Sequence, residues 1–202
     1  FLKGTDIHTS TAAEVFHVDP SLVSSEMRRQ AKAVNFGIVY GIGDFSLAED
    51  LHVSRKTARA YIDSYLATYV QVDAYLKKTV EEAQADGYTT TMMGRRRPIP
   101  ELSAKNKNLQ AFGKRVAMNS PIQGSAADII KLAMIGVSRA IKEAGIDARL
   151  ILQVHDELIV EARPECVKEA SAILRREMEH AVQTTVPLSA DISVGENWLD
   201  AK

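Results

Sequence analysis

Residues 28–41 read Arg28-Arg-Gln-Ala-Lys32-Ala-Val-Asn-Phe36-Gly-Ile-Val-Tyr40-Gly41. In an α-helix, which turns once every 3.6 residues, a spacing of four residues keeps side chains on one slowly winding stripe. This spacing relates two cations and then two aromatic rings, namely Arg28, Lys32, Phe36 and Tyr40. The segment therefore predicts a helix with a charged and aromatic stripe that extends over roughly 18 Å.

Another face of this predicted helix carries core-type side chains. They recur at three- and four-residue spacing at Met27, Ala31, Val34 and Ile38. Docking by this face leaves the stripe exposed. Fixed positive charges followed by flat rings suit a molecule with an anionic end and a stacking end, such as a nucleoside triphosphate. The plainer interpretation is a solvated charged face followed by an aromatic pair in the core.

Two adjacent carboxylates form the second informative pattern. Asp156 and Glu157 lie between the apolar runs 151–154 and 158–160, a pattern that predicts a β-hairpin with the acidic pair at its tight turn. Burial of such a pair is costly unless cations or hydrogen bonds compensate it. Magnesium supplies this compensation, because it prefers oxygen ligands and binds through one or two carboxylates and substrate phosphates. A solvated acidic turn is the alternative.

Composition limits the class of protein. The chain has 202 residues, of which 46% are hydrophobic, enough to bury a core in one domain or two associated subdomains. No apolar run reaches membrane-spanning length and no leader sequence opens the chain, so we expect no membrane partner. A single cysteine, Cys166, excludes an intrachain disulfide and fits the reducing cytoplasm.

Charge is unevenly distributed along the chain. Residues 88–118 contain seven cations against one acid, whereas residues 141–202 contain seven cations against twelve acids. A basic middle segment beside an acidic end fits a protein that holds phosphates on one surface and places carboxylates elsewhere.

Periodicity predicts an α+β fold. Helices are expected after Thr9, over 25–40, in one or more pieces over 54–85, over 108–144 with Pro121 able to deform it, and over 164–184. Short extended segments around a basic turn are expected over 87–100, a hairpin over 148–162 and a last strand over 188–194.

The stripe and several other motifs together resemble the family A DNA polymerases, the bacterial DNA polymerase I group. The resemblance covers essentially the whole chain in one order, through the motifs Asp6-Ile-His-Thr9, Arg28-x3-Lys-x3-Phe-x3-Tyr-Gly41, Arg95-Arg-Arg97, Pro121-Ile-Gln-Gly-Ser-Ala-Ala-Asp128, Val154-His-Asp-Glu157 and Trp198-Leu-Asp-Ala-Lys202. It implies a helical fingers subdomain over residues 1–87 and the C-terminal part of a palm subdomain over 88–202. The implied partners are primer-template DNA and deoxynucleoside triphosphates.

The chemistry implied by the resemblance is a two-metal in-line displacement, in which the primer 3′ hydroxyl attacks the α-phosphate of the nucleotide and pyrophosphate leaves. Two Mg²⁺ ions are expected in the complete enzyme. Asp156 matches the family's metal ligand, and Glu157 is its outer partner. Lys32 is a candidate proton donor to the leaving pyrophosphate.

The resemblance also implies a nucleotide site on the stripe. Arg28 and Lys32 match positions that hold the triphosphate, and His8 matches a further phosphate contact. Phe36 matches the position beside the sugar and base, where Phe instead of Tyr implies discrimination against chain terminators that lack a 3′ hydroxyl. Tyr40 matches the residue that stacks at the templating position.

DNA contacts are expected from two groups of residues. Arg95, Arg96 and Arg97 suit backbone phosphates, which position DNA without reading its sequence. The polar stripe Arg115, Asn119 and Gln123, together with His155, suits minor-groove acceptors common to all correct base pairs. Without the resemblance, polar residues that simply face water explain this stripe equally well.

The family pattern also has parts that are not found here. A strand with the second metal-binding aspartate is expected upstream of Phe1, as is the thumb, so we expect a fragment of a catalytic parent that is inactive or nearly so alone. A non-catalytic nucleic-acid-binding module is the alternative, although the combination of Arg28, Lys32, Tyr40 and Asp156 argues against it. A metal-dependent phosphohydrolase needs more clustered carboxylate or His ligands than the sequence offers.

Overall fold

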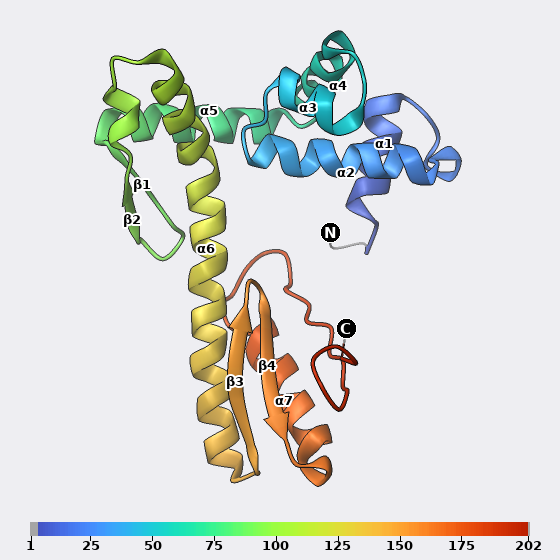
Figure 1. The fold of residues 1–202 in the computed structure, drawn as a ribbon, viewed down its shortest axis with the longest axis vertical. Helices are drawn as coiled ribbons and strands as arrows, with labels where there is room; N and C mark the ends of the chain where they lie inside the picture. The colour runs from blue at the N-terminus through green and yellow to red at the C-terminus, as the bar shows by residue number, and fades with distance from the viewer. Residues whose placement is uncertain (1–3, 202) are drawn as a thin grey trace. The chain divides into compact units, whose positions relative to one another are not determined.

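The computed structural model describes residues 4–201. The α-helices in this range are α1 (Ile7–Phe16), α2 (Ser25–Val39), α3 (Asp44–Leu51), α4 (Arg55–Thr68), α5 (Val70–Asp86), α6 (Lys107–Ala144) and α7 (Val167–Glu179) (Figure 1). Short 3-10 helices occupy Pro20–Leu22, Pro100–Ser103 and Pro164–Cys166. The strands described form two antiparallel hairpins: β1 (Tyr88–Thr90) with β2 (Arg96–Pro98), and β3 (Ala148–Val154) with β4 (Glu157–Ala162). The α+β prediction is confirmed.

Local sequence signals set several helix boundaries. Asp6, Ser24 and Ser54 precede α1, α2 and α4, and each side chain accepts a hydrogen bond from a backbone N–H in the first turn of its helix. These bonds satisfy donors that a helix start otherwise leaves unpaired. Gly87 ends α5 in the left-handed conformation (φ 79°), which glycine adopts without a side-chain clash.

The described chain divides into two compact units, residues 4–123 and 124–201, with the boundary inside α6. The first unit has a main core built from α1 to α5, at Val15, Val34, Ile38, Leu47, Leu51, Ala58, Tyr65 and Leu76. A second cluster of buried residues joins the end of α5 to the 3-10 helix Pro100–Ser103 and the first half of α6, at Ala83, Ile99, Leu102 and Ala117.

The second unit packs one hairpin with two helices. Its core contains one face of the second half of α6, together with Leu158 of β4 and Ile173 of α7. The strands β3 and β4 pair from Ala148 opposite Ala162 to Val154 opposite Glu157, with an irregularity between Leu150 and Leu152. His155 and Asp156 thus form a two-residue turn at one end of the hairpin.

Several predicted helices differ in extent from those observed. The first helix begins at Ile7, before the predicted position, because Asp6 rather than Thr9 caps it. The stretch 54–85 contains two helices that meet at Tyr69, and the short helix α3 was not predicted. Helix α6 continues through Pro121 to Ala144. No helix within residues 4–201 has both the length and the apolarity needed to cross a membrane.

The predictions were wrong near the C-terminus. The predicted helix 164–184 begins with a 3-10 turn and ends at Glu179. Residues 184–186 are β-branched and precede Pro187, a context that disfavours helical backbone. The predicted strand 188–194 is not formed, although its apolar residues alternate. A strand requires a ladder of hydrogen bonds with a neighbour, and this segment pairs with no strand within residues 4–201.

Candidate functional site

Helix α2 presents the predicted stripe to solvent. Of the predicted core face, Ala31, Val34 and Ile38 are buried in the first unit and Met27 is half-buried. Phe36 and Tyr40 are 51% and 53% exposed. Arg28 and Lys32 on the same stripe are also exposed. The predicted orientation of this helix is confirmed, since its core face and its stripe are on different sides.

An ion pair joins the start of α1 to the stripe. Arg28 Nη2 donates to Asp6 Oδ2 at 2.7 Å, while Asp6 Oδ1 accepts from the backbone N–H of Thr9 at 2.7 Å. The Arg28 guanidinium is the largest cause that holds the pKa of the Asp6 carboxyl below its ordinary range, and the Thr9 bond acts in the same direction. Asp6 therefore caps α1 and fixes the position of Arg28 on α2 with one carboxylate.

His8, on the first turn of α1, lies beside Phe36. Their ring centroids are 5.8 Å apart, and Lys32 Nζ lies 5.9 Å from the centroid of Phe36. Burial is the main cause that lowers the pKa of His8, and the nearby Arg28 and Lys32 lower it further while Asp6 opposes them. Two cations, an imidazole and an exposed ring thus gather from α1 and α2.

The C-terminal end of the stripe lies against α6. Tyr40 is the C-cap of α2, and Gly41 follows with φ 67°. A Cβ atom placed on Gly41 would lie 2.5 Å from Met118 Cε and 3.0 Å from Arg115 Cγ. The glycine therefore permits both the left-handed backbone and the close approach of α6, within the first unit.

Polar residues of the predicted DNA contact follow α6. Arg115 and Gln123 are exposed and Asn119 is half-buried. The Arg115 guanidinium lies 5.9 Å from the centroid of the Phe112 ring. Arg115 and Gln123 are thus accessible for contacts, and Asn119 is partly accessible.

The basic turn lies in the β1–β2 hairpin. Thr90 pairs with Arg96 and Thr89 with Arg97, while Arg95 belongs to the connecting turn. Arg96 lies over the ring of Tyr88, with its guanidinium carbon 4.8 Å from the ring centroid. Arg95, Arg96 and Arg97 are exposed, so three cations are presented on one short hairpin.

The second unit carries the predicted metal and catalytic carboxylates. His155 and Asp156 form the β3–β4 turn and Glu157 is the first residue of β4, so only Asp156 of the acidic pair is in the turn itself. His155 has φ 52°, and its carbonyl accepts a hydrogen bond from Gln153 Nε2 at 2.5 Å. Asp156 and Glu157 are exposed, and no group of three or more metal-ligating side chains occurs among residues 4–201.

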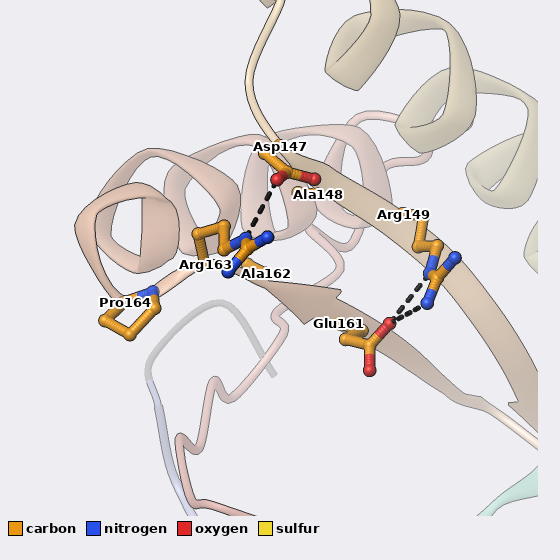
Figure 2. Close-up of a pocket in the computed structure, with 7 residues that line it drawn as sticks. All are labelled: Asp147, Ala148, Arg149, Glu161, Ala162, Arg163 and Pro164. Atoms are coloured by element: carbon orange, nitrogen blue, oxygen red, sulfur yellow. Dashed lines mark hydrogen bonds and ion pairs between the residues drawn. The ribbon is translucent and has the colours of Figure 1, made fainter.

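Figure 2 shows a pocket at the opposite end of this hairpin, lined by Asp147, Ala148, Arg149, Glu161, Ala162, Arg163 and Pro164. Arg149 donates to Glu161 at 2.6 Å and Arg163 donates to Asp147 at 3.0 Å (Figure 2). The charged side chains that line this pocket therefore pair with one another, and the predicted site residues are not among those that line it. This pocket is therefore not the predicted site.

A polar cluster beside His8 was not predicted. Asn35 on α2 contacts His8 and Thr11, and Thr11 contacts Tyr69. The available signal was Asn35 itself, an amide between Val34 and Phe36 in the interior of a helix, where asparagine is unfavourable unless it has a specific partner. Its partner is 27 residues away in the sequence, so spacing does not identify it.

The first unit thus carries a cationic and aromatic stripe and a basic hairpin, and the second unit carries an acidic turn. The chain belongs to DNA polymerase family A, whose model matches residues 1–200. It is 54% identical over its whole length to DNA polymerase I of Bacillus subtilis and 50% identical to that of Caldicellulosiruptor bescii. The chain spans 23% and 24% of these two relatives, respectively.

The fold is also similar to a solved polymerase structure. The POL domain of Pol1 from M. smegmatis, in complex with DNA primer-template and dNTP, is 41% identical with a TM-score of 0.93. The match covers 98% of this chain and 35% of that one.

Proposed function

We propose that the longer protein to which this chain belongs carries out template-directed DNA synthesis, in which a dNTP donates a nucleotide to a primer 3′ hydroxyl. The observation that carries the proposal is the half-buried His8 beside the exposed Lys32, Phe36 and Arg28, in a chain of DNA polymerase family A. The M. smegmatis relative, which was solved with primer-template DNA and dNTP, supports the same partners here. We place the activity in the cytoplasm.

In this proposal, residues 1–87 are the fingers and 88–202 are the C-terminal part of the palm. This division is functional, and it differs from the division into two compact units after residue 123. The fingers would supply the nucleotide site on α1 and α2. The palm would supply the carboxylates of the β3–β4 hairpin.

The stripe on α2 matches the two ends of a nucleotide. Arg28 and Lys32 bind triphosphate oxygens, while His8 donates a further hydrogen bond to them. Lys32 also donates a proton to the leaving pyrophosphate. Negative charge develops on that group in the transition state, and the ammonium stabilises it more strongly than it does in the ground state. Phe36 packs beside the sugar and base, and Tyr40 stacks at the templating position.

Asp156 is the proposed Mg²⁺ ligand, with Glu157 as its outer partner. Both carboxylates are exposed, and no described residue forms a hydrogen bond or ion pair with either side chain. Free carboxylate oxygens fit magnesium, which binds through one or two carboxylates and substrate phosphates. When bound, two ions would neutralise phosphate charge and orient the reacting oxygens.

DNA would contact the basic hairpin and α6. Arg95, Arg96 and Arg97 are proposed to contact backbone phosphates. Arg115, Asn119 and Gln123 on α6, together with His155, are proposed to reach acceptors in the minor groove.

The test is Lys32→Ala in the full-length protein, measured by single-turnover incorporation of a matched nucleotide. We expect kpol/Kd for the nucleotide to fall by more than about tenfold, with primer-template affinity changed by less than about threefold, because the ammonium acts on the triphosphate. Lys56→Ala, which removes an exposed lysine of α4, is the matched control and should change neither quantity. Equal kpol/Kd values for Lys32→Ala and Lys56→Ala would exclude Lys32 from the nucleotide site.

A further inference from the structure

The imidazole of His8 has a specific hydrogen-bond partner on its inner side. Asn35 Nδ2 lies 3.0 Å from His8 Nδ1. An amide NH₂ group only donates hydrogen bonds, so Nδ1 must accept this bond with its lone pair. The ring is then neutral, and its one hydrogen is on Nε2. Among residues 4–201, no side chain or backbone group bonds to Nε2.

Three further side chains determine which end of the Asn35 amide faces His8. After burial, the Glu14 carboxylate is the next cause that raises the pKa of Tyr69. A carboxylate only accepts hydrogen bonds, so Glu14 favours a Tyr69 hydroxyl hydrogen directed toward it. Thr11 Oγ1 lies 3.2 Å from the Tyr69 hydroxyl, and it therefore donates its single hydrogen to that oxygen.

The hydroxyl of Thr11 can then only accept from Asn35. Asn35 Nδ2 lies 3.1 Å from Thr11 Oγ1, and Asn35 Oδ1 lies 3.2 Å from it. With the Thr11 hydrogen directed to Tyr69, the amide nitrogen must supply the bond, which turns its second hydrogen toward His8. Thr11 is fully buried, so water does not compete for this hydroxyl.

Charged groups around His8 favour the same neutral form. Burial chiefly lowers its pKa, and Arg28 and Lys32 of α2 add to this effect, while Asp6 at the start of α1 opposes it. The stripe already supplies two positive charges for an anionic ligand. A neutral donor at His8 adds a hydrogen bond without a third charge beside them.

We propose that Asn35 is a positioning residue that holds His8 as the neutral tautomer with its hydrogen on Nε2, ready to donate to a triphosphate oxygen. The last step rests on the proposed function, whereas the tautomer itself rests on the contacts among His8, Asn35, Thr11 and Tyr69 and on the Glu14 carboxylate beside Tyr69. The opposite tautomer would place a lone pair at Nε2, which repels phosphate oxygens instead of binding them.

The direct test is the tautomer of His8 in the 202-residue chain at about pH 7.5, above the ordinary histidine pKa. Long-range ¹H–¹⁵N spectra of protein labelled at histidine nitrogens distinguish protonated ring nitrogens from those with a lone pair, and His8→Gln assigns the signals. We expect the Nε2–H form to exceed the Nδ1–H form by roughly tenfold, the ratio that one hydrogen bond supports. A dominant Nδ1–H form would overturn the proposal.

Two variants of Asn35 separate positioning from general structural damage. Asn35→Asp keeps the size of the side chain but offers only acceptors, so His8 should change to the Nδ1–H form and its pKa should rise. Asn35→Ala removes the donor and should leave a mixture of both tautomers. Backbone spectra check that both variants fold. If the folded Asp variant retained the Nε2–H form, Asn35 would not control the tautomer.

Kinetics on the full-length protein test the ligand separately. Asn35→Asp should raise the nucleotide KM at pH 7.5 by about tenfold or more, with a smaller change in kcat, because it removes a ground-state contact to the triphosphate. A changed tautomer with an unchanged KM would reject the triphosphate contact of His8 while leaving the tautomer assignment intact.

Discussion

Asp6 and Arg28 connect the first two helices through a single carboxylate. One oxygen of Asp6 caps α1 and the other accepts from Arg28 of α2 at 2.7 Å, across 22 residues of sequence. The pair is partly exposed, so salt and solvent screen it. Its importance is geometric, because it fixes a cation of the stripe beside His8 and Lys32.

Asp6→Asn separates the cap from the ion pair. Asparagine caps helices as well as aspartate does, so the variant mainly loses the charge on Arg28's partner. The folded-state pKa of Asp6 is depressed, so its contribution is present above the ordinary aspartate pKa of about 3.9 and is lost as pH falls. We expect the Tm difference from wild type to be largest near neutral pH and to shrink below about pH 4.

Thermal melts from about pH 7 to pH 3 measure this trend. The difference should also shrink in high salt, since the pair is accessible to ions. A Tm difference that stays constant over both pH and salt would show that altered packing, and not the charge pair, explains the variant.

The surroundings of Gly41 and Gly43 predict that substitution by alanine destabilises the protein more at Gly41 than at Gly43. Gly41→Ala places a Cβ in a left-handed backbone and 2.5 Å from Met118 Cε, whereas Gly43→Ala meets nothing within 4 Å and has φ −89°. We expect Gly41→Ala to lower the free energy of unfolding by about 1–3 kcal/mol. Gly43→Ala should cost about 0.5 kcal/mol or less.

Chemical denaturation of both variants gives this comparison directly. The close approach at Gly41 also involves Arg115, so Gly41→Ala should displace a residue of the proposed DNA contact. Equal stabilities of the two variants would mean that α6 moves away at little cost.

Phe36→Tyr tests the site at the sugar. The Phe36 ring is 51% exposed beside His8 and Lys32, so a hydroxyl at its edge fits without disturbing the core. In the full-length protein we expect Phe36→Tyr to raise incorporation of dideoxynucleotides relative to normal ones, since the tyrosine hydroxyl can take the place of the 3′ hydroxyl that a dideoxynucleotide lacks. Normal extension should be largely retained.

A competition assay between the two nucleotide types measures this ratio. Tyr40→Phe is a useful comparison, because it changes one hydroxyl on the same stripe one turn away and should not affect the sugar. Unchanged discrimination in Phe36→Tyr would show that the proposed role of this position does not hold here.

The stripe could be predicted from the sequence because helical geometry alone relates Arg28, Lys32 and Phe36. The pairs Asp6–Arg28 and His8–Asn35 could not be predicted from the sequence. Each pair joins residues more than 20 positions apart, and it forms only because α1 packs against α2. The segment 188–194 shows the opposite error: its alternation is local, but a strand depends on a neighbour that the pattern does not specify. The roles of Asp156 and Glu157 stay predictions, since a single acidic turn is not a metal site.

The last prediction concerns the 202-residue chain alone. Two-metal chemistry needs carboxylates that hold both ions between primer and nucleotide, and the family resemblance implies that the second metal-binding aspartate belongs to a strand outside this chain. We therefore expect no templated primer extension with Mg²⁺, although full-length protein assayed in parallel should extend the primer. Asp156→Ala in both forms is the control, and it should abolish only the full-length activity. Robust extension by the chain alone, abolished in Asp156→Ala, would mean that this chain or a dimer of it supplies the further ligands.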